Sequence, residues 1–259
     1  TWARDHGGIT VFENGKPVVL DFVFNGWGLK FPANHDNLIT RYLQEHHAVF
    51  NAEIRHGGLV LEGGGIESDG QGTLLTTAEC LLSPNRNPHL SKPEIEANLK
   101  VLFGLDRVLW LHHGYLAGDD TDSHIDTLAR FCDPETIAYV QCSDPEDEHY
   151  EALGKMEEEL KTFYTAAGHP YRLVPLPMPD GCYDDEGTRL PATYANFLII
   201  NGAVLVPTYG VQQDEEALAI LEGCFPGREI IGIDCRALIL QHGSLHCVTM
   251  QYPEGVFFI

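Results

Sequence analysis

The chain has 259 residues, of which 44% are hydrophobic and 10% aromatic, so it can bury a full core without disulfide or metal staples. Sixteen basic residues stand against 38 acidic ones, and the formal net charge is −22. Such a surface repels phosphate backbones and anionic lipid, which argues against nucleic acid or a membrane as partner. A small cation suits the charge, although acidic surfaces also serve solubility alone.

The seven cysteines are odd in number and scattered, and no C-x-x-C pair occurs among them. Neither a disulfide framework nor a zinc knuckle is indicated, and a reducing, cytoplasmic location is expected. No secretory signal is recognisable, and the apolar runs fall short of the roughly 20 residues that span a bilayer. No linker separates two halves, so we expect a single catalytic domain over residues 1–259. Assembly into a homo-oligomer is left open.

Short β-rich runs are joined in pairs by turn residues along the chain. Asn-Gly and Asp-Gly dipeptides supply the positive φ that tight hairpin turns require. The expected hairpins pair 9–12 with 18–24 through Asn14-Gly15, place Asp69-Gly70 before 73–76, pair 124–131 with 136–141, and pair 197–200 with 204–206 through Asn201-Gly202.

A helical pattern and then a short apolar strand follow each hairpin. The helices are expected at 37–47, 93–103, 145–167 and 214–224, and the strands at 49–50, 108–111, 171–174 and 230–233. Ser91 and Glu94 have the spacing of a capping box, and Asp144-Pro145 offers an N-cap with proline at N1. The resulting ββαβ unit recurs four times, which favours blades around an axis, with a plain α/β sandwich as the alternative.

Polar residues stand where each of these units begins. They are Asp5, Glu62, His124 with Asp126, Tyr194 with Asn196, and finally Cys247. If the units are related by rotation, these entrances meet at one end of the axis. We therefore expect the five groups to converge.

Cys247 is the candidate nucleophile, because a thiolate with a histidine for proton transfer is a common catalytic pair. The stretch 241–250 is typical of a buried strand, so the adjacent His246 is expected to point to the opposite face. His124 and Asp126 lie at i and i+2 of another expected strand and should share one face. That pair supplies an acid/base and a carboxylate.

Asp5, Glu62 and Asp126 would raise the pKa of a neighbouring thiol and suppress its thiolate. The arrangement works when the substrate itself is positive. A guanidinium is such a group, and its planar N–H fork matches carboxylates. Taken singly, each residue also has an ordinary interpretation as a surface ion pair, a turn residue or inert packing.

The stretches "TWARDHGG", "FNGWG", "LEGGGIESDGQGTLLTTAECLLSPNRNP", "DDTDSHIDTLARF", "YANFLI" and "HGSLHC" occur in that order. With them the chain closely resembles the agmatine deiminases, which belong with the bacterial peptidylarginine deiminases to the guanidine-modifying pentein superfamily. The resemblance runs from Thr1 to about Pro253.

The resemblance implies an α/β fold, a five-bladed propeller of ββαβ units, with no metal or cofactor. It implies that Cys247 is the nucleophile and His124 the acid/base, with Glu62 orienting that histidine. Asp5 and Asp126 would grip the guanidinium, and Trp2 would wall the pocket. The chain departs from the family in having His6-Gly7-Gly8 where Gly-Pro is usual. The family also has a further N-terminal segment that completes the fifth blade, and we expect that part to be missing here.

The implied reaction is hydrolysis of agmatine to N-carbamoylputrescine and ammonia through a covalent thiouronium on Cys247, a step toward polyamines. Asp119 and Asp120 could bind the distal ammonium of agmatine, or could be a solvated loop. Arg86 and Trp27 are expected to be a loop anchor and core packing.

Three other functions remain open at this point. A peptidylarginine deiminase, or another guanidine-modifying hydrolase, is the sibling alternative. The stretch that holds His112, His113, Asp119, Asp120, His124 and Asp126 could bind a divalent metal in a hydrolase. A protein that sequesters polyamines without turnover is the third.

Overall fold

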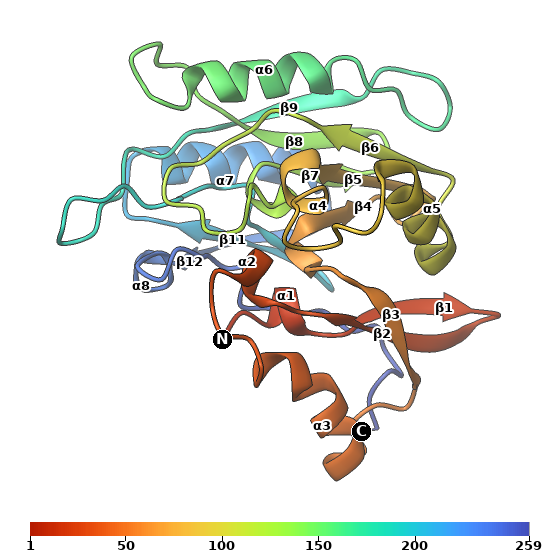
Figure 1. Ribbon diagram of the computed structural model, residues 1–259. Helices are drawn as coiled ribbons and strands as arrows, with labels where there is room; N and C mark the ends of the chain where they lie inside the picture. The colour runs from red at the N-terminus through yellow and green to blue at the C-terminus, as the bar shows by residue number, and fades with distance from the viewer. Residues whose placement is uncertain (259) are drawn as a thin grey trace.

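The computed structural model describes residues 1–258, which form four three-stranded sheets and the helices between them (Figure 1). In each sheet an antiparallel hairpin is followed by a strand parallel to its second member. The strands are β1 (Ile9–Glu13), β2 (Lys16–Val23) and β3 (Glu53–Val60); β4 (Ile66–Ser68), β5 (Thr73–Thr77) and β6 (Arg107–Leu111); β7 (Ala129–Asp133), β8 (Thr136–Gln141) and β9 (Arg172–Pro177); and β10 (Leu198–Ile200), β11 (Ala203–Thr208) and β12 (Glu229–Asp234).

The long helices connect the second and third strands of each unit, as parallel pairing requires a crossover. They are α3 (Ile39–His47), α5 (Lys92–Phe103), α6 (Tyr150–Leu160) and α7 (Gln213–Cys224). The short elements are α1 (Ala3–His6), α2 (Gly26–Leu29), α4 (Ala78–Leu81) and α8 (Arg236–Ile239), with 3-10 turns η1 (Asp36–Leu38), η2 (Gly63–Gly65) and η3 (Ile125–Thr127). The ββαβ repeat expected from the turn residues is therefore confirmed.

The core lies between the sheets and the helices that cover them. Leu75, Val140 and Val204 of the central strands are fully buried, and so are Leu99, Met156 and Leu221 on the helices. Burial of such side chains contributes about 1.5–3 kcal/mol each, the main force that holds each unit together.

Several expected boundaries were wrong. The third strand of the first unit lies at 53–60 and not at 49–50, and α6 begins at Tyr150, five residues after the expected start. Asp144 instead accepts a hydrogen bond from the backbone N–H of Glu146 at 2.9 Å, which closes a local turn. The capping box is confirmed, since Glu94 accepts from both the backbone N–H and the hydroxyl of Ser91.

Two differences matter for the site. Strand β7 begins only at Ala129, because residues 125–127 form the turn η3, and residues 245–248 form a turn where a buried strand was expected. Both segments therefore carry their side chains in turns, where the alternation of a strand does not apply.

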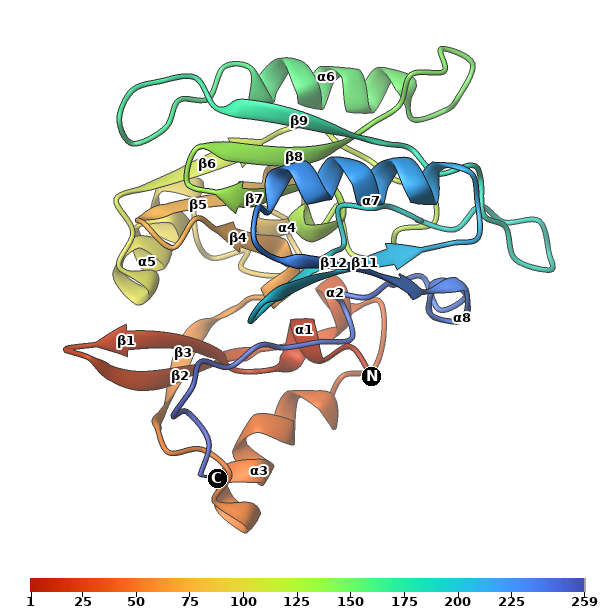
Figure 2. The ribbon, with the colours of Figure 1, turned by 180° about the vertical axis from the view of Figure 1, so that it is seen from behind.

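The mixed α/β class with small sheets is confirmed, whereas a closed five-bladed ring is not: residues 1–258 form four sheets. After α8 the chain runs back beside the β1-β2-β3 sheet, and an isolated bridge joins Phe257 to Phe50 (Figure 2). None of the helices in residues 1–258 is long and apolar enough to cross a membrane.

Candidate active site

The entrances of the units do converge, as expected. Asp5 lies in α1, and Glu62 directly precedes η2. His124 directly precedes η3, Asp126 lies within η3, and Cys247 lies in the turn 245–248. All five side chains are buried, with Cys247 only 7% exposed and His124 1%. These segments are far apart in sequence, and the sheets bring their entrances together.

Gly64 marks the centre of this group. A Cβ atom built on Gly64 would lie 2.6 Å from Nδ1 of His124, 2.8 Å from Oδ1 of Asp5 and 3.2 Å from Oδ1 of Asp126. The imidazole and two carboxylates therefore surround one point that only glycine leaves open. Oδ1 of Asp5 also accepts a hydrogen bond from the Gly64 backbone N–H at 3.0 Å.

Cys247 is held between an amide and a carboxylate. Its sulfur lies 3.5 Å from Oδ1 of Asn196 and 3.9 Å from Oδ2 of Asp126. Asn196 also accepts from the backbone N–H of His246 at 2.8 Å and donates to the carbonyl of Asp126 at 3.2 Å. Asn196 thus ties η3 to the turn that carries the thiol, which explains its place at the entrance of the fourth unit.

The expectation for His246 was wrong. Because residues 245–248 are a turn, His246 faces the same region as Cys247, and its Nδ1 lies 2.7 Å from Oδ2 of Asp126. Burial lowers the pKa of His246 and raises that of Asp126. The bond fixes the orientation of the Asp126 carboxylate.

Glu62 is paired with an arginine that the sequence analysis assigned to a loop. Nε of Arg86 lies 2.9 and 3.1 Å from the two oxygens of Glu62, and both side chains are fully buried. A buried carboxylate needs such a partner, and this need was the signal that could have found Arg86. Glu62 Oε2 lies 4.0 Å from Nε2 of His124, while Asp5 Oδ1 lies 3.6 Å from its Nδ1.

Three buried polar atoms of this group have no hydrogen-bond partner within residues 1–258. They are the two ring nitrogens of His124 and Oδ1 of Asp126. Buried polar atoms are paired in the great majority of cases, and the exceptions concentrate at functional sites. One donor-rich planar ligand between the carboxylates could pair with Asp126.

Burial controls the charges here. It raises the pKa of Asp5 to about 8, and the charge of Asp126 adds to this rise. It also raises the pKa of Asp126 to about 7, although the charges of Arg130 and Arg4 act to lower it. Burial, followed by the charges of Asp126 and Asp5, raises the pKa of Cys247 well above its usual value. Burial, followed by Arg86 and Lys30, lowers the pKa of His124 far below its usual value. A cation placed among these groups would favour the ionised acids and so oppose the effect of burial on their pKa values.

Trp27 also belongs to the site, contrary to the expectation of core packing. Its Nε1–H donates to Oδ2 of Asp5 at 2.9 Å. Residues 26–29 have four consecutive positive φ angles, 72°, 57°, 78° and 70°. Left-handed conformations cost non-glycine residues about 1–2 kcal/mol each, so the segment that carries Trp27 stores strain at Trp27 and Leu29. The "NGWG" sequence was the available signal.

The other predicted residues lie farther out. The Trp2 ring packs on the backbone of Gly243, near the Cys247 turn. Both oxygens of Asp119 accept local bonds, from the backbone and hydroxyl of Thr121 and the backbone of Ser123. Asp120 is partly exposed, with Oδ2 3.5 Å from Nδ1 of His242. Tyr194 donates to Asp214 at 2.7 Å, and among residues 1–258 it has no hydrogen bond to Cys247.

The described residues offer one group with metal-ligating atoms in reach of one another, formed by Glu62, Cys80 and His124 within 4.8 Å. The bidentate contact of Arg86 with Glu62 opposes a cation there, so the residues do not suit a resident metal. The His/Asp-rich stretch is not gathered: His112 and His113 are exposed, and Glu159 accepts from the backbone N–H of each.

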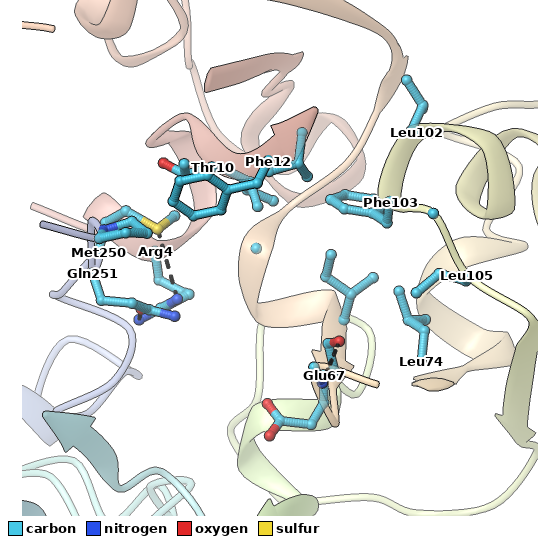
Figure 3. A pocket seen from close by; sticks show the side chains of 18 of the residues that line it. Arg4, Thr10, Phe12, Glu67, Leu74, Leu102, Phe103, Leu105, Met250 and Gln251 are labelled. Carbon is cyan, nitrogen blue, oxygen red and sulfur yellow. Dashed lines mark hydrogen bonds between the residues drawn. The ribbon is translucent and has the colours of Figure 1, made fainter. Parts of the chain in front are cut away.

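A cavity of 610 Å³ lies between β1, β4, the end of α5 and residues 246–253 (Figure 3). Arg4, Gly63 and His246 line it, each one residue from Asp5, Glu62 or Cys247. Arg4 is buried in α1 and bonds Oε1 of Gln251 at 2.5 Å and Sδ of Met250 at 3.7 Å. Arg4 thus anchors the C-terminal segment beside the site.

Comparison with known proteins defines the class. Residues 1–253 match the model of the Porphyromonas-type peptidyl-arginine deiminase family. A Porphyromonas gingivalis structure, provisionally named an arginine deiminase, is 60% identical with a TM-score of 0.97, over 100% of this chain and 76% of that one. A substrate-bound cysteine-to-serine variant of C. jejuni agmatine deiminase is 46% identical with a TM-score of 0.89, over 95% of this chain and 72% of that one.

A Marinomonas protein, provisionally named an agmatine deiminase, is 36% identical over 98% of this chain and 73% of its own length. The chain thus spans about three quarters of these relatives. It belongs to the Porphyromonas-type peptidyl-arginine deiminase family.

Proposed function

We propose that the chain is an agmatine deiminase, a hydrolase that cleaves a C–N bond of a linear amidine. It converts agmatine and water to N-carbamoylputrescine and ammonia. The observation that carries the proposal is the buried group of Asp5, His124 and Asp126 around one point at Gly64, with the Cys247 sulfur 3.9 Å from the Asp126 carboxylate.

The guanidinium lies between Asp5 and Asp126, where its N–H groups pair with Oδ1 of Asp126 and its charge favours the ionised acids. The same charge lowers the pKa of the Cys247 thiol, whose proton passes to His124. The thiolate then forms a bond to the central carbon, and His124 gives its proton to the nitrogen that leaves as ammonia.

The product of this step is a thiouronium on Cys247. Water attacks the same carbon and gives a proton to His124. The C–S bond then breaks as the added hydroxyl group loses its proton to the sulfur, which releases the urea product and the thiol, and His124 gives its proton to solvent. Asp5 and Asp126 contribute orientation and electrostatics. Glu62, 4.0 Å from Nε2, orients His124 and stabilises its protonated form.

Asn196, His246 and Trp27 act as positioning residues. Asn196 and His246 hold Cys247 and Asp126, and Trp27 holds Asp5. Trp2 walls the site from the side of Gly243. Asp119 and Asp120 favour the distal ammonium of agmatine over the carboxylate of arginine through their charge.

The proposed architecture is the five-bladed propeller, of which the four sheets are four blades. Four units of the same strand order support it. The proposed location is the cytoplasm, supported by seven free cysteines. A net charge of −22 favours a small cationic partner over nucleic acid.

Peptidylarginine is the second candidate substrate, because the matching family carries that name. An ammonia-release assay on agmatine, free arginine and a blocked peptidyl-arginine separates the two. We expect turnover of agmatine, and a loss of at least about 1,000-fold for Cys247→Ala. The half-buried Cys182 provides the matched control, Cys182→Ala, which should keep full activity. Equal turnover by Cys247→Ala would contradict the covalent mechanism, and preference for the peptide would reassign the substrate.

A further inference from the structure

The short segment α2, which carries Trp27, is strained along its whole length. Its four residues have positive φ angles, two of them at residues other than glycine. Backbone in such conformations persists only where the surrounding structure fixes it. Asn25 fixes the first end of α2, because its side chain accepts from the backbone N–H of Gly28 at 2.9 Å and donates to the carbonyl of Asn85 at 2.8 Å.

Lys30 fixes the other end of α2. It follows Leu29 directly, and its ammonium donates to Oδ1 of Asp122 at 2.5 Å and to the carbonyl of Asp120 at 2.7 Å. These acceptors lie in the loop that leads to His124. One ammonium therefore joins the segment that carries Trp27 to the loop that carries the proposed acid/base.

The acceptor of Lys30 is itself firmly held. Oδ2 of Asp122 accepts from Nη1 of Arg86 at 2.6 Å, and the Arg86 side chain is fully buried against Glu62. A Cβ atom built on Gly28 would lie 3.4 Å from Nη1 of Arg86 and 3.5 Å from Oδ2 of Asp122, so α2 packs on this pair. Lys30 thus connects α2 to a buried network of charges and not to a free surface side chain.

We propose that Lys30 is a positioning residue of the deiminase reaction: its bond to Asp122 holds α2 so that the Trp27 indole keeps its hydrogen bond to Asp5. The inference rests on the proposed function, in which Asp5 binds the guanidinium. Ion pairs as exposed as this one usually contribute little to stability. Lys30 differs because the segment it holds is strained, so that loss of the bond lets α2 relax and moves the indole N–H away from Asp5.

The first test needs no substrate. The chain has three tryptophans, so nitrogen-15 labelling of the indoles gives three NMR signals, and Trp27→Phe identifies that of Trp27. Lys30→Met should shift the Trp27 signal and speed the exchange of its indole proton with solvent about tenfold, while the Trp110 signal stays in place. Lys155→Met is the matched control, because Lys155 forms an exposed ion pair with Glu151 at 2.6 Å on α6. An unmoved Trp27 signal in Lys30→Met would overturn the proposal.

Kinetics then show whether Lys30 acts through Trp27. Lys30→Met should lower kcat/KM for agmatine about threefold to fivefold, and Lys155→Met should not. Lys30→Arg should restore about half of the wild-type value or more, because a guanidinium can donate to the same carboxylate. In the Trp27→Phe background, Lys30→Met should cause no further loss.

Two kinetic outcomes would contradict this role of Lys30. They are losses that multiply in the Lys30→Met, Trp27→Phe double variant, and failure of Lys30→Arg to restore activity. Absence of agmatine turnover by the wild-type chain, with the shift of the Trp27 signal intact, would instead overturn the proposed substrate and leave the contact between Lys30 and α2 established.

Discussion

At the scale of single residues, the site is a set of buried acids and a thiol whose ionised forms are unfavourable until a cation binds among them. Burial raises the pKa of Asp5 to about 8 and that of Asp126 to about 7. Without substrate, both carboxyls therefore hold protons in a range where exposed acids have lost them. Substrate binding and proton release are linked as a result.

The first prediction concerns pH. A bound guanidinium favours the ionised acids, so binding releases protons and should tighten as pH rises through 7 to 8. Calorimetry with agmatine and the inactive Cys247→Ala variant measures this between pH 6 and 9. Asp126→Asn should bind at least about 10-fold more weakly at pH 9 with a flatter profile. Affinity that falls with rising pH would contradict the clamp.

The same raised pKa values predict how stability changes with pH. Folded Asp5 and Asp126 hold protons that the unfolded chain releases near pH 4, so their contribution is present below pH 4 and is lost as pH rises through 7 to 8. Denaturant unfolding should show a free energy of unfolding that declines over this window. The decline should be smaller in Asp126→Asn. If the free energy of unfolding of that variant falls with pH as steeply as that of the wild type, Asp126 does not hold a proton in the folded chain.

Trp27 offers a prediction about positioning. Trp27→Phe keeps an aromatic ring but removes the N–H that donates to Asp5. A hydrogen bond to a charged group contributes roughly 1.5–3 kcal/mol, so kcat/KM for agmatine should fall about 10- to 100-fold. Trp110→Phe is the matched control, because Nε1 of Trp110 donates at 3.4 Å to Glu96, outside the site. Equal effects of the two substitutions on kcat/KM would show that Trp27 does not position Asp5.

At the scale of the elements, the decisive feature is that turns and short helical segments carry the functional side chains. The glycine turn η2 brings the backbone of Gly64 against His124, Asp5 and Asp126. A strand with ordinary side chains could not approach so closely. Regular strands and helices provide the frame, and the irregular segments between them provide the chemistry.

Gly64→Ala tests this packing. Its methyl group would lie 2.6 Å from Nδ1 of His124, so the imidazole and the carboxylates must shift. A misplacement of catalytic groups by about 1 Å lowers kcat about 100-fold. Gly154→Ala, on the exposed face of α6 with nothing within 4 Å, should keep full activity and raise the free energy of unfolding by about 0.5–1 kcal/mol. Activity assays and denaturant unfolding of both variants decide; an active Gly64→Ala would refute the close packing.

Much of this organisation follows from the sequence alone. Asn-Gly and Asp-Gly turns located the hairpins, and helix periodicity located α5 and α7 closely. The convergence of Asp5, Glu62, His124, Asp126 and Cys247 followed from the repeat, although the strand alternation used for His124 and His246 was wrong. Turns such as η3 and 245–248 depend on tertiary hydrogen bonds, here those of Asn196, which no local pattern reveals.

The contributions of Arg86 and Trp27 were hidden for a related reason. Each acts on a residue that is distant in sequence, Arg86 on Glu62 and Trp27 on Asp5. Local propensity assigns an arginine in a loop and a tryptophan in an apolar stretch to ordinary roles. Only the folded chain shows that Arg86 neutralises the buried Glu62 and that Trp27 orients Asp5.

At the scale of the whole molecule, the net charge of −22 predicts long-range attraction of cationic substrates. Because salt screens this attraction, kcat/KM for agmatine should fall about 3- to 10-fold between 20 and 300 mM NaCl in stopped-time ammonia assays. A singly charged guanidine, such as propylguanidine, is the matched comparison and should fall less. An equal dependence for both would show that the overall field does not assist capture.

The covalent step is the claim on which the mechanism depends most. Rapid acid quench of the enzyme with agmatine, followed by intact-mass and peptide analysis, measures it directly. The account predicts a transient adduct on Cys247 with the mass of agmatine less ammonia, absent from Cys247→Ala. Full turnover with no adduct on Cys247 at any quench time, together with activity of the alanine variant, would contradict it.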